Sequence, residues 1–491
     1  MPLESRRFNV PQRGWNTDDP IRELSIDFSP NISDCFYEKA NEIKRRLAQN
    51  PHIVAAFADG GDADHMFEHK GFTGTSKLFA HTDANSIYED VAGVWTSRDT
   101  SFTSRIRTAK LGNLVVMGDG VNPAKTYNGT TFAAVTTPPI APFASYIGNI
   151  FHSHKGRMFA AGDPARRMDV IHSATIGGGG SGADYWSTVL SGVNQGGFID
   201  VAADVPDSDE ITGLTSHLGR LVVFTNNRVV FYNTSEGTSG LEATVHKIVD
   251  GEGCVSHDTI QGVGNDTLFL SPNGYKSLAQ VLVQGDSGVA NESIPINDHV
   301  KTLLRDTVTI ADIRSIYLPN HGVYICNLGT EQHVFQSQFK AWTKWTGIAK
   351  VLFRDSNGNA YTASTTVQTL DDSVDRDTSG ATPSAISYIL ETAPIRISEQ
   401  EVKPRFIRAE IIAECEPDES ITFEYWTDNE EDNKITETII LNEGGAARAS
   451  VDLRIPVIGR GEFMTMRVTN SNNTDFRISA FELYFITGGM R

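Results

Sequence analysis

The most regular feature of the chain is a repeated phrase: a glycine, a short apolar run, a turn and a second apolar run. Copies begin at Gly112, Gly156, Gly219, Gly264 and Gly322, and a related stretch covers 351–361. The spacing of roughly 45 to 60 residues suits a four-stranded β-propeller blade of about 40–50 residues with insertions in its loops. Each phrase is therefore predicted to form the two central strands of one blade.

The turns inside these phrases carry residues that tolerate a positive φ. They are Asn-Gly at 128–129, Asn-Asn at 226–227, Pro-Asn-Gly at 272–274 and Ser-Asn-Gly at 356–358. The runs themselves are nearly continuous in Leu, Val, Phe and Tyr, as expected of sheets covered on both faces. Unrelated hairpins in β-sandwiches would show similar turns. The repetition of one phrase favours a propeller of about six to eight blades.

From about residue 401 the pattern changes to strict alternation. Six strand-like segments follow, at 405–413, 420–426, 435–441, 449–455, 462–468 and 477–485. Ile421, Phe423 and Tyr425 share one face of their strand, which is typical of a two-layer sandwich. The fold class expected is all-β, with an extended N-terminal segment over 1–30, a propeller with loop insertions over 31–400 and a C-terminal β-sandwich over 401–491.

Helical signals are few. Residues 297–305 begin with a cap-like Asn and place Val300 and Leu303 at i and i+3, which predicts a short helix. Residues 37–47 fit either a short helix or a charged hairpin. Long loops are expected at 59–65, 177–182 and 371–380.

Composition narrows the class of protein. With 39% hydrophobic and 21% charged residues, the chain has enough apolar material for a folded core. No apolar run is long enough for a membrane helix, and the first residues lack the apolar region of a secretory signal. The four cysteines are far apart, without a CxxC pair, so neither a disulfide framework nor a zinc site is expected, and synthesis in a reducing cytoplasm fits.

The formal net charge of −19 disfavours tight non-specific binding of nucleic acid. Two interpretations remain open. The charge serves solubility alone, or it forms an acidic wall past which DNA slides without sticking.

The sequence contains no G-x-S-x-G motif, no HExxH motif and no Walker-type phosphate loop. Two acidic loops contain oxygen ligands at tight spacing, but neither has the twelve-residue calcium loop ending in Glu, so solvated loops are favoured. These residues are Asp59, Asp62, Asp64 and His65 in the first loop, and Asp371, Asp372, Asp375 and Asp377 in the second. No catalytic, cofactor-binding or metal-binding residue is predicted.

A glycan-cleaving propeller is the enzymatic alternative. Residues 97–102 partly match the Asp-box turn of sialidases, but the match occurs once, so the chain is predicted not to be an enzyme. Trp342 and Trp345 suggest a sugar platform, yet three residues apart on a strand they face opposite sides, which favours core packing plus a rim contact. Asp99 and Asp184 are the carboxylates on which this alternative depends.

Three stretches point to a known family. They are 184–186 with 209–224, 253–275, and 333–345, and a terminal pattern at 459–467 and 476–484 accompanies them. In these phrases the chain resembles the tail nozzle, or tail tube and stabilisation, proteins of short-tailed bacteriophages.

The resemblance implies a structural virion protein made in the host cytoplasm. Six copies would form the nozzle of a short tail, with a head-to-tail adaptor above and tail fibres or other receptor-binding proteins outside. Double-stranded DNA would pass through without tight binding, and neither cofactor nor membrane insertion is implied. Glycan binding or cleavage is the alternative function. The insertion at 177–186 is expected to contact a neighbouring subunit or partner.

Overall fold

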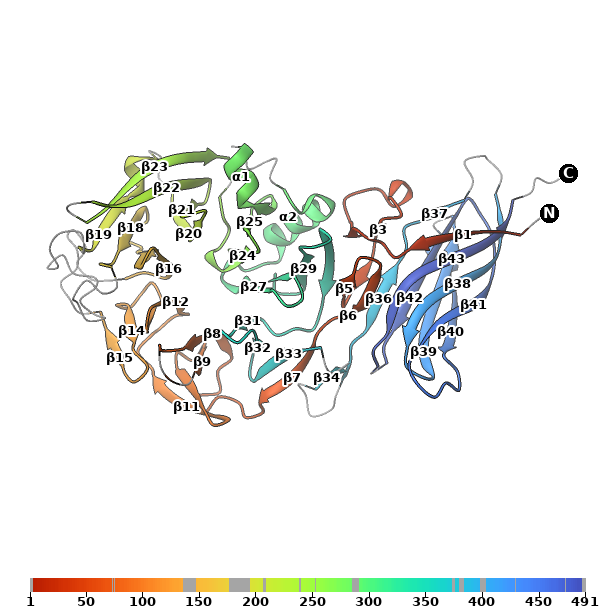
Figure 1. The fold of residues 1–491 in the computed structure, drawn as a ribbon, viewed down its shortest axis with the longest axis horizontal. Coiled ribbons are helices and arrows are strands. Elements are labelled where there is room, and N and C mark those ends of the chain that lie inside the picture. The colour runs from red at the N-terminus through yellow and green to blue at the C-terminus, as the bar shows by residue number, and fades with distance from the viewer. Residues whose placement is uncertain are drawn as a thin grey trace.

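The computed structural model describes residues 3–487 except 73, 75, 136–146, 176–194, 206–208, 238–239, 252, 285–290, 373–375, 379–383, 398–402, 429 and 473. Figure 1 shows a ring of small sheets beside a second body of long strands, which carries both ends of the chain. The all-β prediction of a propeller with a sandwich is confirmed.

The ring contains seven blades. The first three are β8 (Ala63–His69), β9 (Lys77–Thr82), β10 (Ile87–Val91) and β11 (Val94–Asp99); β12 (Arg107–Leu111), β13 (Leu114–Gly118), β14 (Lys125–Tyr127) and β15 (Phe132–Ala134); and β16 (Ile150–His154), β17 (Arg157–Ala161), β18 (Asp169–His172) and β19 (Gly197–Asp200). Within each blade, neighbouring strands are consecutive in sequence and antiparallel.

Three further blades follow the same meander. They are β20 (Ile211–His217), β21 (Arg220–Thr225), β22 (Arg228–Gly237) and β23 (Gly240–Asp250); the three-stranded β24 (Gln261–Val263), β25 (Asp266–Ser271) and β26 (Gly274–Ser277); and β27 (Arg314–Leu318), β28 (Val323–Asn327), β29 (Gln332–Gln336) and β30 (Ala341–Trp345).

The seventh blade closes the ring with a strand from near the N-terminus. β31 (Val351–Arg354), β32 (Ala360–Ala363) and β33 (Val367–Asp371) are completed by β7 (Ala48–Ile53), which pairs antiparallel with β33. β7 precedes the first blade in the sequence, and β33 belongs to the last blade, so this pairing joins the two ends of the ring. The ring can open only if the pairing breaks.

The repeated glycines lie in tight turns that precede the apolar runs of each phrase. Gly112, Gly156, Gly219, Gly264 and Gly322 all have positive φ, between 58° and 75°. Each lies between the first and second strand of a blade, and the two apolar runs after it form the second and third strands. The interpretation of a phrase as the two central strands of a blade is confirmed in the four-stranded blades that contain Gly112, Gly156, Gly219 and Gly322. It is wrong for the Gly264 phrase, which ends on the edge strand β26, and for 351–361, which forms the first two strands of its blade.

Helices are short. α2 (Asn297–Asp306) confirms the predicted helix, and α1 (Leu278–Gln284) follows the fifth blade. Residues 37–47 form a hairpin of β5 (Cys35–Lys39) and β6 (Glu42–Arg45) rather than a helix. Short 3-10 turns lie at η1 (Ile21–Glu23), η4 (Val201–Ala203), η5 (His257–Thr259), η6 (Ile294–Ile296), η7 (Ile310–Asp312) and η8 (Glu431–Asn433). Within the described ranges, none of the helices has the length and apolar character needed to cross a membrane.

The second body is a two-layer sandwich built on the six predicted C-terminal strands. They are β38 (Arg405–Cys415), β39 (Glu419–Thr427), β40 (Ile435–Leu441), β41 (Ala449–Arg460), β42 (Phe463–Asn470) and β43 (Arg477–Ile486). One layer has the order β41-β38-β43-β6-β5, and β1 (Glu4–Asn9) also pairs with β43. The other contains β36 (Tyr388–Glu391), β42, β39 and β40, with β37 (Ile395–Arg396) on β42.

The strand pairing differs from the expected domain boundaries. Residues 32–45 and 388–396, placed in the propeller from the sequence, pair with strands of the sandwich, and β1 is part of a sheet rather than a free extension. These strands are short and distant in sequence from their partners. Local patterning therefore carried no sign of the pairing.

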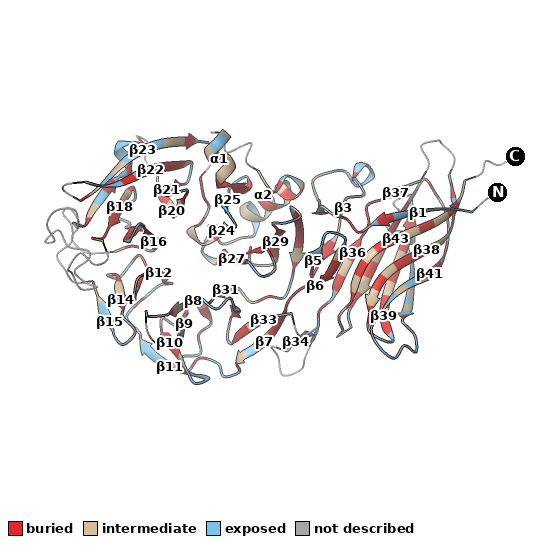
Figure 2. Cartoon of the chain, viewed as in Figure 1, coloured by how far each residue is buried: buried red, intermediate tan, exposed pale blue. Residues whose placement is uncertain are grey.

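One sheet runs through both bodies. The outer strand of the sixth blade, β30, pairs in parallel with β4 (Ile32–Ser33), and β4 pairs with β36 of the sandwich. Next to them, β2 (Gly14–Trp15) pairs with β30 and with β3 (Phe28–Ser29); the small hairpin β34 (Arg376–Asp377) and β35 (Ser384–Ala385) lies after the last blade. A single buried apolar cluster extends from Tyr275 and Trp342 in the propeller to Phe423 in the sandwich. Figure 2 shows buried residues along the strands of both bodies.

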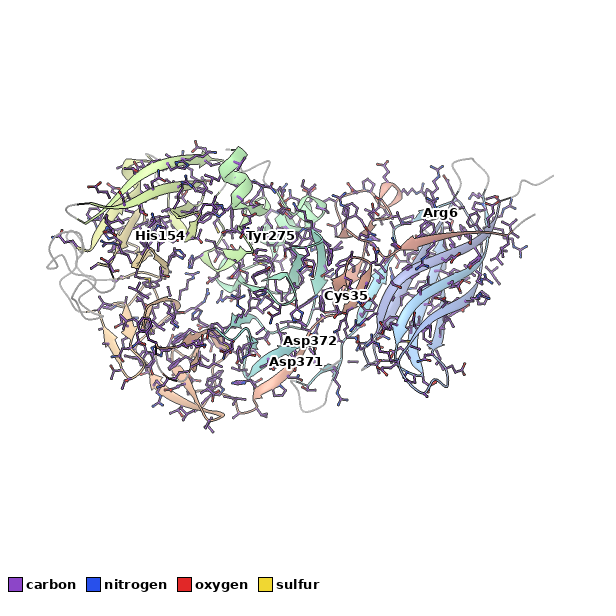
Figure 3. All side chains as sticks on the ribbon, in the orientation of Figure 1. Arg6, Cys35, His154, Tyr275, Asp371 and Asp372 are labelled. Carbon is purple, nitrogen blue, oxygen red and sulfur yellow. The ribbon has the colours of Figure 1, made fainter. Side chains whose placement is uncertain are left out.

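A buried ion network reinforces this junction. Arg46 Nε lies 2.9 Å from Asp34 Oδ1, and Arg46 Nη2 lies 2.6 Å from Asp377 Oδ2. Asp34 also accepts hydrogen bonds from the backbone N–H and hydroxyl of Thr346, at 2.8 and 2.7 Å. Figure 3 marks the neighbouring Cys35 between the two bodies. All four cysteines are buried and unpaired.

Candidate functional site on the propeller axis

The inner wall of the propeller is formed by the first strand of each blade. Around the ring, β31, β8, β12, β16 and β20 contact one another in sequence, and β24, β27 and β31 do the same. The 3-10 turn η5 contacts both β20 and β27. Side chains from these strands and from η5 therefore meet on the axis, where propellers commonly hold their ligands.

Two arginines at the beginning of the second blade converge on one carboxylate, and a third arginine lies near them. Asp258 Oδ2, on η5, accepts from Arg107 Nε at 2.9 Å and lies 2.8 Å from Arg107 Nη2. Arg105 Nη2 lies 2.9 Å from the same oxygen. Arg314, at the start of β27, donates to the backbone carbonyls of Ile313 at 2.8 Å and Asp64 at 3.2 Å.

Burial and neighbouring charges shift the pKa values of the ionisable groups in this cluster. Burial raises the pKa of Asp258, but the Arg107 and Arg105 charges outweigh burial and hold that pKa well below its usual range. Burial, followed by repulsion from Arg105, lowers the pKa of Arg314 to about 9. A pKa of about 9 still leaves Arg314 protonated at neutral pH, so a strongly acidic protein places positive charge on its propeller axis.

Two cavities lie beside the cluster. One of about 450 Å³ is lined by Arg105, Arg107 and His257, and another of about 240 Å³ by Arg107, His257 and Arg314. The shared residues stand between them. The Nε atoms of Arg105 and Arg314 are buried and have no hydrogen-bond partner among the described residues.

Histidines near the axis are neutral. Burial lowers the pKa of His257 to about 4 and that of His152 to about 3. Burial likewise holds the pKa of His65 well below its ordinary value. Neutral imidazoles beside the arginines avoid further repulsion within the cluster.

No protein-family model and no curated protein matches the sequence. Among solved structures, a computationally designed protein, Ika8, matches at 10% identity and a TM-score of 0.35, over 66% of this chain and 99% of that one. The Pan2 WD40 domain of Neurospora crassa matches at 10% identity and 0.37, over 67% and 95%. An exo-beta-1,3-galactanase from Phanerochaete chrysosporium matches at 9% and 0.26, over 89% and 100%. None of these likenesses carries an argument about function.

The first acidic loop does not gather its side chains around one point. Asp59 accepts from the Thr82 hydroxyl at 2.6 Å, Asp64 pairs with His81 Nδ1 at 2.7 Å, and His65 Nε2 lies 3.1 Å from the Thr108 hydroxyl. The Asp62 backbone N–H donates to Asp83. Each group has its own partner in the local turn or a neighbouring blade.

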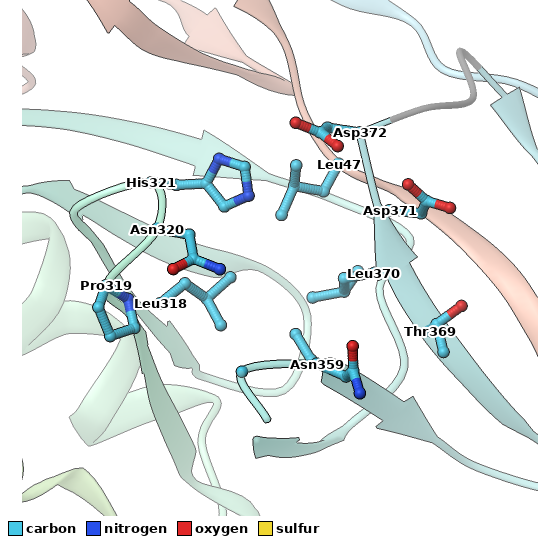
Figure 4. A pocket seen from close by; sticks show the side chains of 12 residues that line it. Leu47, Leu318, Pro319, Asn320, His321, Asn359, Thr369, Leu370, Asp371 and Asp372 are labelled. Carbon is cyan, nitrogen blue, oxygen red and sulfur yellow. The ribbon is translucent and has the colours of Figure 1, made fainter. Parts of the chain in front are cut away.

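The second acidic loop is also divided. Asp377 belongs to the buried network with Arg46, while Asp371 and Asp372 border a cavity of about 310 Å³ opposite His321 (Figure 4). Asp375 lies outside the described residues.

The tryptophan pair is core, which contradicts the sugar-platform interpretation. Trp342 and Trp345 are fully buried and pack into different apolar clusters, so they face opposite sides as predicted, but neither reaches the rim. Their indole N–H groups donate to the backbone carbonyls of Glu292 and Cys35, each at 2.8 Å.

The glycan-cleaving alternative depends on two carboxylates, Asp99 and Asp184. Asp99 caps a local turn through Ser101 and accepts from Lys125 Nζ at 2.7 Å. Asp184 and the insertion at 177–186 lie outside the described residues.

The axial arginines were not found from the sequence. Arg105, Arg107, Asp258 and Arg314 have no shared spacing, and only closure of the ring brings them together. The available signal was weaker: a charged residue at the first position of an inner strand, as Arg107 and Arg314 are.

Proposed function

We propose that the protein is a structural virion component that forms the hexameric nozzle of a short bacteriophage tail. The observation that supports this best is the sheet shared by the propeller and the sandwich through β30, β4 and β36. A shared sheet, a continuous apolar core and a buried ion network make the two bodies one rigid unit. Rigid units suit an assembly that must hold its shape while DNA passes, and the phrase resemblance points to the same class.

In this proposal the conduit lies between subunits. The propeller's own axis contains cavities of about 450 and 240 Å³ beside the arginine cluster, which are sizes suited to small molecules and not to a DNA duplex. Several copies arranged around a common axis enclose a wider lumen. The net charge of −19 gives such a wall little affinity for passing phosphates.

The sandwich supplies surfaces for assembly with other copies, the adaptor or fibres. Strands β40 and β41 are sheet edges, and they expose Ile435, Ile440 and Ile458, at 40%, 47% and 74%. Edge strands with exposed apolar side chains are suited to pairing with another chain.

Native mass spectrometry of the full chain, alone and with the adaptor–portal complex, tests this proposal. The expected result is a complex with six copies when the adaptor is present. A chain that remains monomeric with the adaptor, and never joins the complex, would overturn it.

The glycan-cleaving alternative has less support from the axial chemistry. Glycosidases need a carboxylic acid whose pKa is raised so that it can protonate the leaving group. Asp119, in the larger axial cavity, has a pKa held below its ordinary value, because hydrogen bonds from Asn122 and Thr103 outweigh its burial, and Asp258 is held lower still. Hydrolysis of a glycan panel that is lost on changing Asp99 or Asp184 would reverse this preference.

A further inference from the structure

A second cluster of chemistry-bearing side chains lies away from the axis, where the sixth blade meets α2. Glu331 and His333 are at the beginning of β29, and His299 projects from α2. Glu331 Oε1 lies 2.5 Å from His299 Nε2 and 2.8 Å from His333 Nε2, and the three atoms lie within 4.8 Å of one another. Within the described ranges, this is the one group of three or more such ligands that meets on a point.

Two imidazoles and one carboxylate are a ligand set that late first-row divalent metals prefer. In tetrahedral zinc sites with bonds of about 2.0–2.2 Å, ligand atoms stand roughly 3.3 Å apart. The two Glu331–histidine separations are shorter than this, so the carboxylate must move away from the imidazoles to admit an ion.

Neighbouring polar groups contact two of the three ligands, His333 and Glu331, through the ligand atoms that do not face the cluster. Tyr275 Oη lies 3.2 Å from His333 Nδ1 and so fixes the ring with Nε2 toward Glu331. Glu331 Oε2, the oxygen turned away from the histidines, lies 3.9 Å from Lys344 Nζ. Outer partners of this kind are typical of metal sites, where they position the ligand and adjust its basicity. Figure 3 marks Tyr275 in the propeller near the junction with the sandwich.

Trp15 covers the cluster from the N-terminal segment. Its ring contacts His299 and His333 edge-on, with centroids 4.9 and 5.6 Å apart, and Lys344 Nζ lies 5.2 Å from the Trp15 ring. Trp15 is 3% exposed and belongs to β2, which pairs with β30 at the junction. Anything that fixes the two imidazoles therefore also fixes the surface on which the N-terminal segment docks.

We propose that His299, Glu331 and His333 bind one divalent transition-metal ion of the zinc type, with water in the fourth position. The ion ties α2 to β29 beneath Trp15 and stabilises the docking of the N-terminal segment. The ligand set disfavours Mg²⁺ and Ca²⁺, which require more oxygen ligands.

Isothermal titration of the full chain, first stripped with a chelator, tests this site with Zn²⁺ alone. The expected stoichiometry is one Zn²⁺ per chain, with no heat from Mg²⁺ or Ca²⁺ and a higher melting temperature in Zn²⁺. Glu331→Gln and His299→Gln are expected to weaken binding at least 100-fold. Tyr275→Phe, which keeps the ring but loses the hydroxyl, is expected to weaken binding about tenfold. His246→Gln, an exposed histidine on β23, is the matched control and should change nothing.

Absence of Zn²⁺ binding by the unaltered chain would overturn the proposal and leave a hydrogen-bonded network in its place. So would binding that His299→Gln leaves intact. If Glu331→Gln fails to fold, His299→Gln decides the matter, because that side chain is 30% exposed and tolerates substitution. Cobalt replacement adds a second readout, since visible absorption bands of a low-symmetry Co²⁺ site are expected in the parent chain and not in His299→Gln.

Discussion

The propeller and the sandwich differ in how they treat buried polar groups. All thirteen histidines of the chain lie between residues 52 and 333, within the propeller, and many of them are buried beside arginines or hydroxyls. The sandwich has no histidine, and its interior is a continuous apolar cluster from Phe406 to Phe485. The propeller thus has small apolar cores with buried histidines between them, whereas most of the sandwich interior is one apolar cluster with a few buried polar groups such as Glu419 and Asn470.

The two bodies also differ in the range of their contacts. In six blades each strand pairs with the next strand in the sequence, and only the seventh takes a distant strand, β7. In the sandwich, β1 pairs with β43 across almost the whole chain. Six blades are therefore specified locally, whereas the seventh blade and the sandwich depend on pairing between distant parts of the chain. Each difference predicts a measurable effect.

Acid should unfold the propeller first. Burial lowers the pKa of His152 to about 3 and those of His172 and His257 to about 4, while in the unfolded chain they titrate near 6.5. Stability is therefore complete above about pH 6.5 and falls as the pH decreases toward 4, because the unfolded chain takes up protons first. A tenfold difference in proton affinity is worth about 1.4 kcal/mol, so three such groups give the largest effect.

Hydrogen exchange measured by mass spectrometry between pH 8 and pH 4, corrected for intrinsic exchange rates, locates this transition. Protection in β16–β25 should be lost before protection in β38–β43. Loss of protection in the sandwich first, or in both bodies together, would contradict the expected difference in acid stability between the propeller and the sandwich.

Arg46→Ala should weaken the junction severely. The substitution leaves Asp34 and Asp377 buried without their cation, which typically costs about 3–5 kcal/mol. Denaturant unfolding measures this as a lower free energy of unfolding. Arg305→Ala is the control, because Arg305 is 72% exposed, and should leave the free energy of unfolding nearly unchanged.

Two buried leucines compare the cores directly. Leu221 in the fourth blade and Leu483 in the sandwich are both fully buried, so each change to Ala should cost about 3 kcal/mol. The regions that the two changes destabilise should differ. Leu483 belongs to the cluster that continues into the propeller, whereas Leu221 belongs to a cluster of the third and fourth blades. Leu221→Ala should speed exchange in β16–β23 only. Equal spread from both variants would mean that the cores are not separate.

The smallest expected effect on stability comes from changing a glycine to alanine, and a second glycine with nearly the same φ serves as the control. Gly14 and Gly219 have φ near +76° and +75°, so Ala is strained by about 1 kcal/mol at either position. At Gly219 the added Cβ meets nothing within 4 Å, but at Gly14 it would lie 2.2 Å from the Trp342 carbonyl oxygen. Thermal melts should show Gly14→Ala less stable than Gly219→Ala by roughly 1–3 kcal/mol. Equal melting temperatures would show that β2 does not dock on β30 as described.

The same contrast explains what the sequence could predict. The blade phrases, their turn glycines, helix 297–305 and the six C-terminal strands follow from local patterning, and the structure contains them all. Residues 32–45 were misplaced because their partners on β36 and β43 lie hundreds of positions away. The axial arginines and the His299–Glu331–His333 cluster were missed for the same reason. Their residues carry no shared motif and meet only when distant strands or helices close together.

Electron cryo-microscopy of the full chain assembled with its adaptor tests the central claim most directly, because it shows both the ring and the position of its lumen. The account predicts a ring of six copies whose lumen lies between subunits, with Arg105, Arg107, Arg314 and Asp258 on each propeller axis. A protein that stays monomeric beside the adaptor, or a ring in which DNA density runs through the propeller axis, would contradict it.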